Sequence, residues 1–223
     1  MHLSRVRLVN HAEAVRQAGG RPVVVPTCVD LEHYPADRMA KQPELADDEP
    51  LRAVWVGLPA NLEQLLVAER PLRKAIESGA LQLEVVTGEG GDLRGLPVKR
   101  TPWSAEGERR ALAAAHVGLM PLPADAWSEG KCALKLLQYQ AAGLACIASP
   151  VGANRSLADC GAVLLADDEA QWLEAIDRLR SASERQSLAA RGRHLIETEY
   201  SVQAWAPKLA QIYRDAVEGR WSD

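Results

Sequence analysis

The residues best suited to chemistry lie in a short stretch that contains two lysines and a glutamine. Lys131 falls near the expected start of a helix, where the helix dipole disfavours a positive charge, and a bound pyrophosphate would offset that cost. Lys135 follows four residues later and Gln138 seven residues later, so the three side chains can share one helix face. The sheet-facing side is expected to hold Leu134, Leu137 and Ala141. The alternative is a lysine stripe exposed to solvent.

Two turns built from small residues could complete an anion site. Gly57 and Leu58 follow an expected strand and precede a helix, whose first N–H groups would be free to bind a phosphate. Val151 and Gly152 follow another expected strand, and backbone N–H groups there could form an anion-binding nest. The first turn lacks a GxGxxG fingerprint, and both turns can equally be ordinary connections.

The scaffold for these residues is a series of alternating strands and helices after residue 50. We expect strands at 53–56, 81–87, 98–100, 117–120, 145–149 and 162–165, and helices at 61–77, 104–115, 131–142, 167–179, 183–199 and 201–217. Pro71 is expected to kink or split the first helix. This alternation implies an α/β fold with a doubly wound, Rossmann-like parallel sheet. Such sheets bind ligands beyond the carboxyl ends of their strands, where both turns fall.

The first 49 residues differ from the rest of the chain. A helix is expected from Leu3 to Gln17 and a strand from Val23 to Val25, followed by polar, proline-rich residues typical of a linker. We therefore expect three parts: residues 1–49, a binding domain at residues 50–200, and a C-terminal helix at residues 201–223.

Composition argues against several classes of function. Lys and Arg number 26 against 30 Asp and Glu, so the net charge of −4 disfavours nucleic acid as the main partner. The four cysteines form no CxxC pair and do not cluster with the five histidines, so zinc spacing is absent. No apolar run reaches the roughly 18–20 residues of a membrane span, and from the first residues given we expect no signal peptide. We expect a cytoplasmic protein, with peripheral contact at the inner membrane face left open.

Other polar or aromatic side chains are expected to be structural. His116 begins a strand and forms no nucleophile motif with Ser104 or with any cysteine. Core or interface positions are expected for Trp55, Trp103, Trp172 and Trp205. The candidates for binding and catalysis therefore remain those around Lys131.

Six segments follow one another in a recognisable order. They are Val25-Pro26-Thr27-Cys28-Val29-Asp30, Val54-Trp55-Val56-Gly57, Ala115 to Leu122, Gly130-Lys131 through Gly143, Ile147 to Gly152, and Tyr200-Ser201 with the helix after it. Their order and spacing resemble the C-terminal half of GT-B glycosyltransferases of family 4, the glycosyl transferases group 1. The resemblance implies a nucleotide-sugar-binding, Rossmann-like domain that forms one half of a GT-B architecture.

The resemblance also implies how a UDP- or GDP-sugar would bind. Its phosphates would meet Gly57, Leu58 and Lys131, with further support from Lys135. The ribose would meet Gln138. Members of the family retain the anomeric configuration and need no metal or tightly bound cofactor; cationic side chains and helix dipoles stabilise the departing nucleoside diphosphate.

The sugar itself would lie at the loop before the helix. The resemblance places it near Glu129, Gly130 and Lys131, and makes Lys131 and Glu129 the catalytic candidates. Backbone at Val151 and Gly152 would close on the diphosphate.

The sequence departs from the family pattern in three ways. The family usually places two glutamates where this chain has Gly130 and Gln138, so Glu129 is a candidate replacement for the first. Residues 58–66 lack the usual basic side chains. The acceptor-binding N-terminal domain is reduced at most to its last helix and strand. A sugar or lipid-linked acceptor would then be held by a missing N-terminal domain or by a partner chain. Separately, the C-terminal helix is a candidate surface for a homodimer.

Three functions remain open at this point. The first is a glycosyltransferase donor domain, which depends on an acceptor domain. The second is a non-catalytic module that binds a nucleotide sugar or acts as a scaffold, as the missing carboxylates suggest. The third is an epimerase-like sugar-nucleotide enzyme, which fold alone does not separate from the first.

Overall fold

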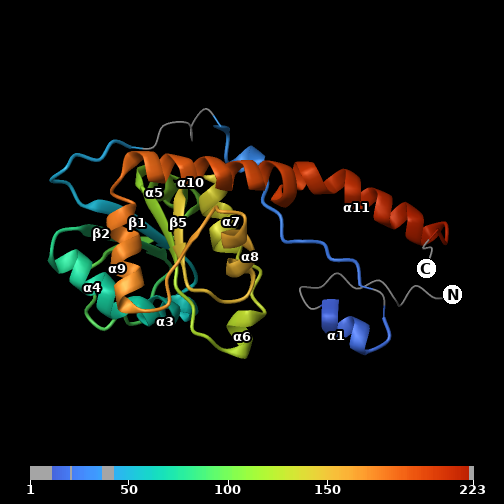
Figure 1. Cartoon of the computed structure of the whole chain (residues 1–223), viewed down its shortest axis with the longest axis horizontal. Helices are drawn as coiled ribbons and strands as arrows, with labels where there is room; N and C mark the ends of the chain where they lie inside the picture. Colours follow the sequence, from blue (N-terminus) through green and yellow to red (C-terminus); the bar gives the residue numbers. More distant parts are fainter. Residues whose placement is uncertain (1–11, 21, 37–42, 221–223) are drawn as a thin grey trace.

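The computed structural model describes residues 12–20, 22–36 and 43–220, and a parallel six-stranded sheet forms its centre (Figure 1). The strands are β1 (Leu51–Val56), β2 (Leu81–Thr87), β3 (Lys99–Pro102), β4 (Val117–Met120), β5 (Ala145–Ala148) and β6 (Leu164–Leu165). Their order in the sheet is β3-β2-β1-β4-β5-β6, and every pairing is parallel. The strand order reverses between β1 and β4, which is where doubly wound sheets open a crevice at their carboxyl edge. The predicted α/β fold class is confirmed.

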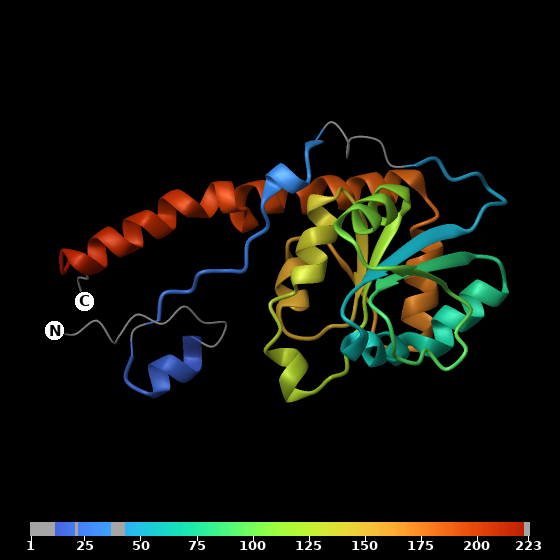
Figure 2. The ribbon, with the colours of Figure 1, turned by 180° about the vertical axis from the view of Figure 1, so that it is seen from behind.

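Helices cover both faces of the sheet (Figures 1 and 2). One core contains side chains of α3 (Leu62–Leu65), α4 (Glu69–Glu77) and α9 (Glu169–Arg178). The other contains side chains of α5 (Ala105–Ala114), α7 (Leu134–Ala141) and α8 (Ala153–Asp159). Helix α10 (Ala182–Leu195) packs on α7 and β5, and a π-helical turn, Ile196–Tyr200, links it to α11 (Val202–Val217).

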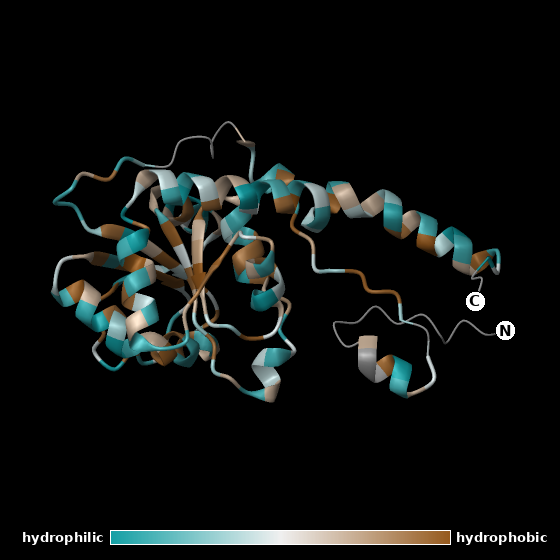
Figure 3. Ribbon diagram, in the orientation of Figure 1, coloured by the Kyte–Doolittle hydropathy of each residue, from teal (hydrophilic) through white to brown (hydrophobic). Residues whose placement is uncertain are grey.

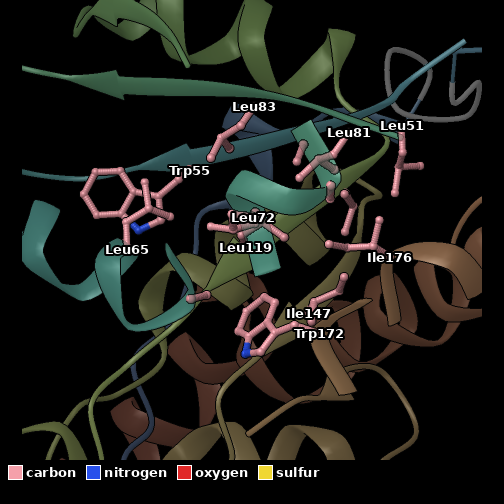
Figure 4. Close-up of a cluster of buried hydrophobic side chains, with 14 of the residues drawn as sticks. Leu51, Trp55, Leu65, Leu72, Leu81, Leu83, Leu119, Ile147, Trp172 and Ile176 are labelled. Carbon is pink, nitrogen blue, oxygen red and sulfur yellow. The ribbon is translucent and has the colours of Figure 1, made fainter. Parts of the chain in front are cut away.

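Side chains of the central strands alternate between the two cores. In β1, Leu51, Ala53 and Trp55 enter the first core, whereas Val54 and Val56 enter the second. Figure 4 shows the first core, where Trp55 lies among leucines from the neighbouring strands and helices. Successive side chains of a strand point to opposite faces of the sheet, and here the residues on both faces are apolar. This pattern is typical of a strand that is covered on both faces. The hydropathy colouring shows the same apolar strands inside more polar helices (Figure 3).

Two predicted helices differ in their boundaries. The first breaks at a 3₁₀ turn, Leu66–Ala68, whereas Pro71 lies in the first turn of α4, where its missing N–H would have no intrahelical partner. The second begins at Leu134 rather than at Lys131, and a separate short helix, α6 (Ala126–Glu129), precedes it. Lys131 therefore lies in the loop between α6 and α7.

The segment before the sheet is attached to the end of the chain. Helix α1 (Ala12–Gln17) is the described part of the predicted N-terminal helix, and residues 3–11 lie outside the described residues. Of residues 23–25, predicted as a strand, only Val23 forms a β-bridge, and the segment is not part of the six-stranded sheet. Val29 instead bonds on both sides of Ser201: its N–H donates to the Tyr200 carbonyl and its carbonyl accepts from Val202, each at 2.9 Å.

Helix α11 extends beyond the sheet (Figure 1). It contains no buried residue, and Tyr213 and Val217 are 56% and 80% exposed. Within the described ranges, no helix combines the length and the apolar character needed to cross a bilayer. The division into residues 1–49, 50–200 and 201–223 stays a prediction.

Candidate functional site

A cavity of about 830 Å³ opens at the carboxyl ends of β1 and β4. Val56 and Gly57 line it from β1, Met120 from β4, and further residues from the loop after β4 and from α7. This is the point where the strand order reverses, so the ligand site expected from topology and the cavity coincide. Its volume is within the usual range for sites of drug-sized ligands and cofactors.

Two lysines face this cavity without a carboxylate partner. Lys131 and Lys135 both line it, and no ion pair to either is found in the part of the chain that the structure describes. Burial, with a smaller contribution from the nearby Lys131 charge, lowers the pKa of Lys135 to about 8. Burial also lowers the pKa of Lys131, although Asp125 partly opposes that shift. Two cations held this close in a partly desolvated cavity favour an anionic ligand.

Gly57 allows Lys135 to reach the end of β1. A Cβ at Gly57 would lie 2.5 Å from Cη2 of Trp55 and 3.0 Å from Cε of Lys135. The Lys135 ammonium lies 5.1 Å from the centre of the Trp55 ring, a cation–π contact. Leu58 follows at the cavity wall and is 69% exposed. The predicted role of the Gly57 turn therefore has a steric basis, since a larger residue would displace the indole and the lysine.

Tyr139 fixes α7 against the two strands that carry the cavity. Its ring packs on Gly118 in β4, where a Cβ would lie 2.3 Å from the tyrosine Cδ2. Its hydroxyl accepts a hydrogen bond from the Val56 N–H at 2.9 Å. With this face of α7 buried, Lys135 and Gln138 are turned to the cavity. Leu134 also lines the cavity and is 42% exposed, so the prediction that it faces the sheet is wrong.

Three predicted site residues do not line the cavity: Glu129, Val151 and Gly152. The Glu129 carboxylate accepts hydrogen bonds from Arg155 at 3.0 Å and from the Gly152 N–H at 3.0 Å. These contacts, with Arg155 the largest cause, lower the pKa of Glu129. The Val151 N–H donates to the Ser149 carbonyl at 2.8 Å.

The backbone N–H groups of the turn after β5 therefore already have hydrogen-bond acceptors within the chain. Gly152 has φ +53°, and a Cβ there would lie 2.8 Å from the Glu129 carbonyl oxygen, so the close approach requires glycine. Glu129 occupies the N–H group that was predicted to bind a diphosphate. The catalytic role of Glu129 and the phosphate role of Val151 and Gly152 stay predictions, and both require this contact to open.

Two cavity residues were not assigned to the site from the sequence. Trp103, expected in the core or at an interface, is 57% exposed and lines the cavity. Glu108 of α5 lines it as well, and its carboxylate accepts from Trp103 Nε1 at 2.7 Å and from Gln138 Nε2 at 3.4 Å. Glu108 and Gln138 are 30 positions apart, and no local spacing pattern brings them together. Only the packing of α5 and α7 on the same face of the sheet could have revealed the pair.

His116 belongs to a different cluster, at the amino ends of β1 and β4. It is fully buried, its Nδ1 accepts from the Arg52 N–H at 3.0 Å, and its Nε2 lies 2.9 Å from Arg52 Nη2. Burial, with a smaller contribution from the Arg52 charge, lowers its pKa to about 4. His116 is therefore a neutral, structural residue, as expected. Across residues 12–20, 22–36 and 43–220, no group of three His, Cys, Asp or Glu side chains is placed to hold a metal ion.

The fold and the cavity define a Rossmann-like α/β domain with a cationic ligand site at its topological switch point. Residues 51–182 match the family described as Glycosyl transferases group 1, and since this is more than half of the chain, the protein belongs to that family. Membership of the family 4 subclass stays a prediction. A comparison with curated proteins finds no match.

Solved structures share the fold. Sucrose-phosphate synthase from Thermosynechococcus elongatus is 21% identical with a TM-score of 0.69, over 96% of this chain and 58% of its own. Anabaena Alr3699/HepE, crystallised with UDP and glucose, is 13% identical with a TM-score of 0.67, over 94% of this chain and 62% of its own. The C-terminal domain of LpcC from Francisella tularensis is 13% identical with a TM-score of 0.53, over 78% of this chain and 99% of its own.

These likenesses establish one half of a GT-B fold. The chain spans 58% of the synthase and 62% of HepE, whereas it spans nearly all of an isolated C-terminal domain. The described sheet therefore corresponds to a part of the larger proteins.

Proposed function

We propose that this chain is the donor-binding part of a glycosyltransferase and binds a nucleoside-diphosphate sugar, with UDP or GDP as the nucleotide. The single observation that carries the proposal is the pair Lys131 and Lys135, which lines the switch-point cavity without forming an ion pair among the described residues. A diphosphate supplies the charge that this pair lacks. The complex of HepE with UDP and glucose supports the choice of ligand.

In the proposed reaction the lysines act on the leaving group. As the bond between the sugar and the diphosphate breaks, negative charge grows on the diphosphate oxygens, and the two ammonium groups stabilise it. Gly57 and Tyr139 hold Lys135 in place before the ligand arrives, so little reorganisation is needed. We propose that transfer of a hexose proceeds with retention, without a metal, and that the acceptor is held by another domain or chain, in contact with the unburied helix α11.

Calorimetric titration of the purified chain with UDP and GDP tests the proposal. At least one of the two nucleotides is expected to bind, and Lys131→Ala is expected to weaken that binding by about thirtyfold, because a charge-assisted contact is lost. Lys74→Ala is the matched control, since Lys74 is exposed and pairs with Glu169 far from the cavity. Failure of both nucleotides to bind, or an equal effect of the two variants, would contradict the proposal.

A non-catalytic binding module is the second candidate. The observation in its favour is that Glu129 is engaged by Arg155 and Gly152, while the second carboxylate position is Gln138. Incubation of the chain with UDP-glucose or GDP-mannose, alone and with a supplied acceptor domain, separates the two candidates. Release of UDP or GDP favours the transferase, whereas tight binding without turnover in both mixtures favours the module.

A further inference from the structure

Glu108 is the one carboxylate on the wall of the switch-point cavity, within the residues that the structure describes. The charged side chains facing this space are Lys131, Lys135 and Glu108. A carboxylate beside an anion site repels phosphate, and this weakens binding unless the carboxylate bonds to another part of the ligand. The presence of Glu108 therefore indicates that the ligand carries a neutral, hydrogen-bond-donating group as well as its phosphates.

The carboxylate of Glu108 is held in place and still has acceptor capacity. Oε2 accepts from Trp103 Nε1 at 2.7 Å, and Oε1 is 3.4 Å from Gln138 Nε2. Each oxygen of an ionised carboxylate can accept two hydrogen bonds, so one position remains on each oxygen. Two free acceptor positions on one carboxylate suit two neighbouring hydroxyl groups of a sugar.

The cavity residues follow a definite order along α7. Lys131 precedes the helix, Lys135 lies in its first turn, and Gln138 lies one turn further on, where it meets Glu108. Trp103 also lines the cavity, and its indole is bonded to Glu108. The hydroxyl-accepting carboxylate therefore lies beside Gln138, one turn along α7 from Lys135. A nucleoside diphosphate likewise has its ribose next to its phosphates.

We propose that Glu108 accepts hydrogen bonds from the 2′- and 3′-hydroxyls of the nucleotide ribose and selects ribonucleotides over 2′-deoxyribonucleotides. This inference rests on the proposed donor site. In it, Glu108 on α5 supplies the carboxylate that is absent from α7, where position 138 is a glutamine. A 2′-deoxy ligand leaves a charged acceptor of Glu108 unpaired inside the cavity, and sites built to bind a hydroxyl discriminate strongly for this reason. The same charge directs the phosphates toward the lysines.

Calorimetric titration with UDP, GDP, their 2′-deoxy counterparts and inorganic pyrophosphate tests the inference. For the nucleotide that binds, the wild-type chain is expected to favour the ribose form by about tenfold, the loss expected for one hydrogen bond to a charged group. Glu108→Gln is expected to reduce this ratio to about twofold, because the charge and one acceptor are lost. Pyrophosphate, which has no ribose, is expected to bind Glu108→Gln at least as tightly as wild type.

Two further variants separate Glu108 from its surroundings. Glu106→Gln makes the same change on the same helix, but Glu106 is 76% exposed, pairs with Arg110 and lies outside this cavity, so the ribose ratio is expected to stay at about tenfold. Trp103→Phe removes the indole N–H and keeps the carboxylate, so it is also expected to keep the ratio. A larger loss of discrimination in Trp103→Phe than in Glu108→Gln would mean that the indole, and not the carboxylate, meets the ribose, and would overturn the inference.

The outcomes also distinguish this inference from the proposed function. If pyrophosphate and a nucleoside diphosphate bind but wild type shows no preference for ribose, Glu108 has no such role and the donor site stands. If Glu108→Gln keeps the full ratio, the inference is likewise wrong. If no nucleotide and no pyrophosphate bind, the donor site fails and the role of Glu108 fails with it.

Discussion

The two ends of the central strands both hold buried or partly buried basic groups, but only one end satisfies them internally. At the amino end, His116 and Arg52 bond to each other, and Arg52 also donates to the carbonyls of Ala114 at 2.9 Å and Glu44 at 3.2 Å. At the carboxyl end, Lys131 and Lys135 face an open cavity without an ion pair in the described chain.

The difference between these ends separates structural from functional polar groups. A buried polar group whose partners come from the chain adds to stability, and its pKa shift reflects packing alone. A cation that is partly desolvated without an ion-pair partner destabilises the free protein, so its persistence indicates a ligand that supplies the missing negative charge. Variants at each end can test whether the carboxyl end is the ligand end and the amino end is purely structural.

The largest effect is expected for Lys135→Met. The variant keeps the length and packing of the side chain but removes the charge, so the affinity for the preferred nucleoside diphosphate should fall about a hundredfold. The same variant should raise the free energy of unfolding at pH 7 by about 1–2 kcal/mol, because a partly buried cation with a pKa lowered to about 8 is removed. Calorimetry and chemical denaturation measure the two effects.

Lys74→Met is the control for this prediction. Lys74 is 65% exposed on α4 and pairs with Glu169 at 3.5 Å, so its replacement should change neither quantity appreciably. Loss of stability in Lys135→Met would show that the lysine is satisfied by the free protein, and the contrast between the two ends would disappear.

The opposite behaviour is expected at the amino end for His116→Leu. The buried Arg52 N–H would lose its acceptor, and the free energy of unfolding should fall by about 2 kcal/mol. His116→Asn should recover part of this loss, because its side-chain oxygen can accept the same hydrogen bond. Nucleotide affinity should be unchanged in both variants, as calorimetry at a temperature where both are folded would show. A large change in affinity would link the two ends.

The pH dependence of binding is expected to follow the lysines. In the free protein Lys135 is protonated below about pH 8, so above that pH the binding of a diphosphate must be coupled to proton uptake. Affinity should therefore fall by about tenfold per unit above pH 8, and the lowered pKa of Lys131 acts in the same direction. Titrations from pH 7 to 9.5 in buffers of different ionisation enthalpy measure both affinity and proton uptake. Lys135→Arg should abolish most of the decline.

Stability should change with pH in a different window at each end. The folded pKa of His116 is about 4, below the usual 6.5, so the unfolded chain binds more protons between these values and the free energy of unfolding falls as pH drops from 6.5 toward 4. For Lys135 the window lies between about 8 and 10.5, and its contribution makes the fold more stable as pH rises through it.

Much of the fold could be predicted from local pattern alone. Strands such as β1 and β2 are apolar, end at glycines and alternate with helices, so their existence and parallel arrangement follow from the sequence. The position of Lys131 was less predictable, because Ala133 adopts the left-handed conformation, φ 55°, and delays the start of α7 to Leu134. No residue type in that segment signals the break.

The positions of site residues could be predicted where the residues lie on one helix. Contacts between residues of two separate elements could not be predicted. Lys135 and Gln138 are on one helix, and their shared face follows from helical spacing. Glu108 joins Gln138 from α5, and Glu129 turns to Arg155 at the start of α8, so both contacts depend on how separate elements pack. The family resemblance assigned Glu129 to the sugar as a replacement for the glutamate missing at Gly130, but adjacency in sequence does not fix the direction of a side chain.

The smallest effect on stability and affinity is expected at the exposed contact of Glu129 with Arg155. This contact lies at the carboxyl end, but like the amino-end groups its side chains are already bonded within the chain. The two side chains are 46% and 52% exposed, and exposed ion pairs of this kind contribute little to stability. Glu129→Gln should therefore leave the free energy of unfolding almost unchanged, whereas its effect on nucleotide affinity depends on what the Gly152 N–H does. If that N–H is released to a diphosphate, affinity should rise about threefold, and Arg155→Gln, which leaves the carboxylate on Gly152, should not reproduce the gain. A decrease in affinity of similar size in Glu129→Gln would instead mean that the carboxylate holds the loop carrying Lys131 in its binding position, and the turn after β5 would then belong with the internally satisfied groups of the amino end.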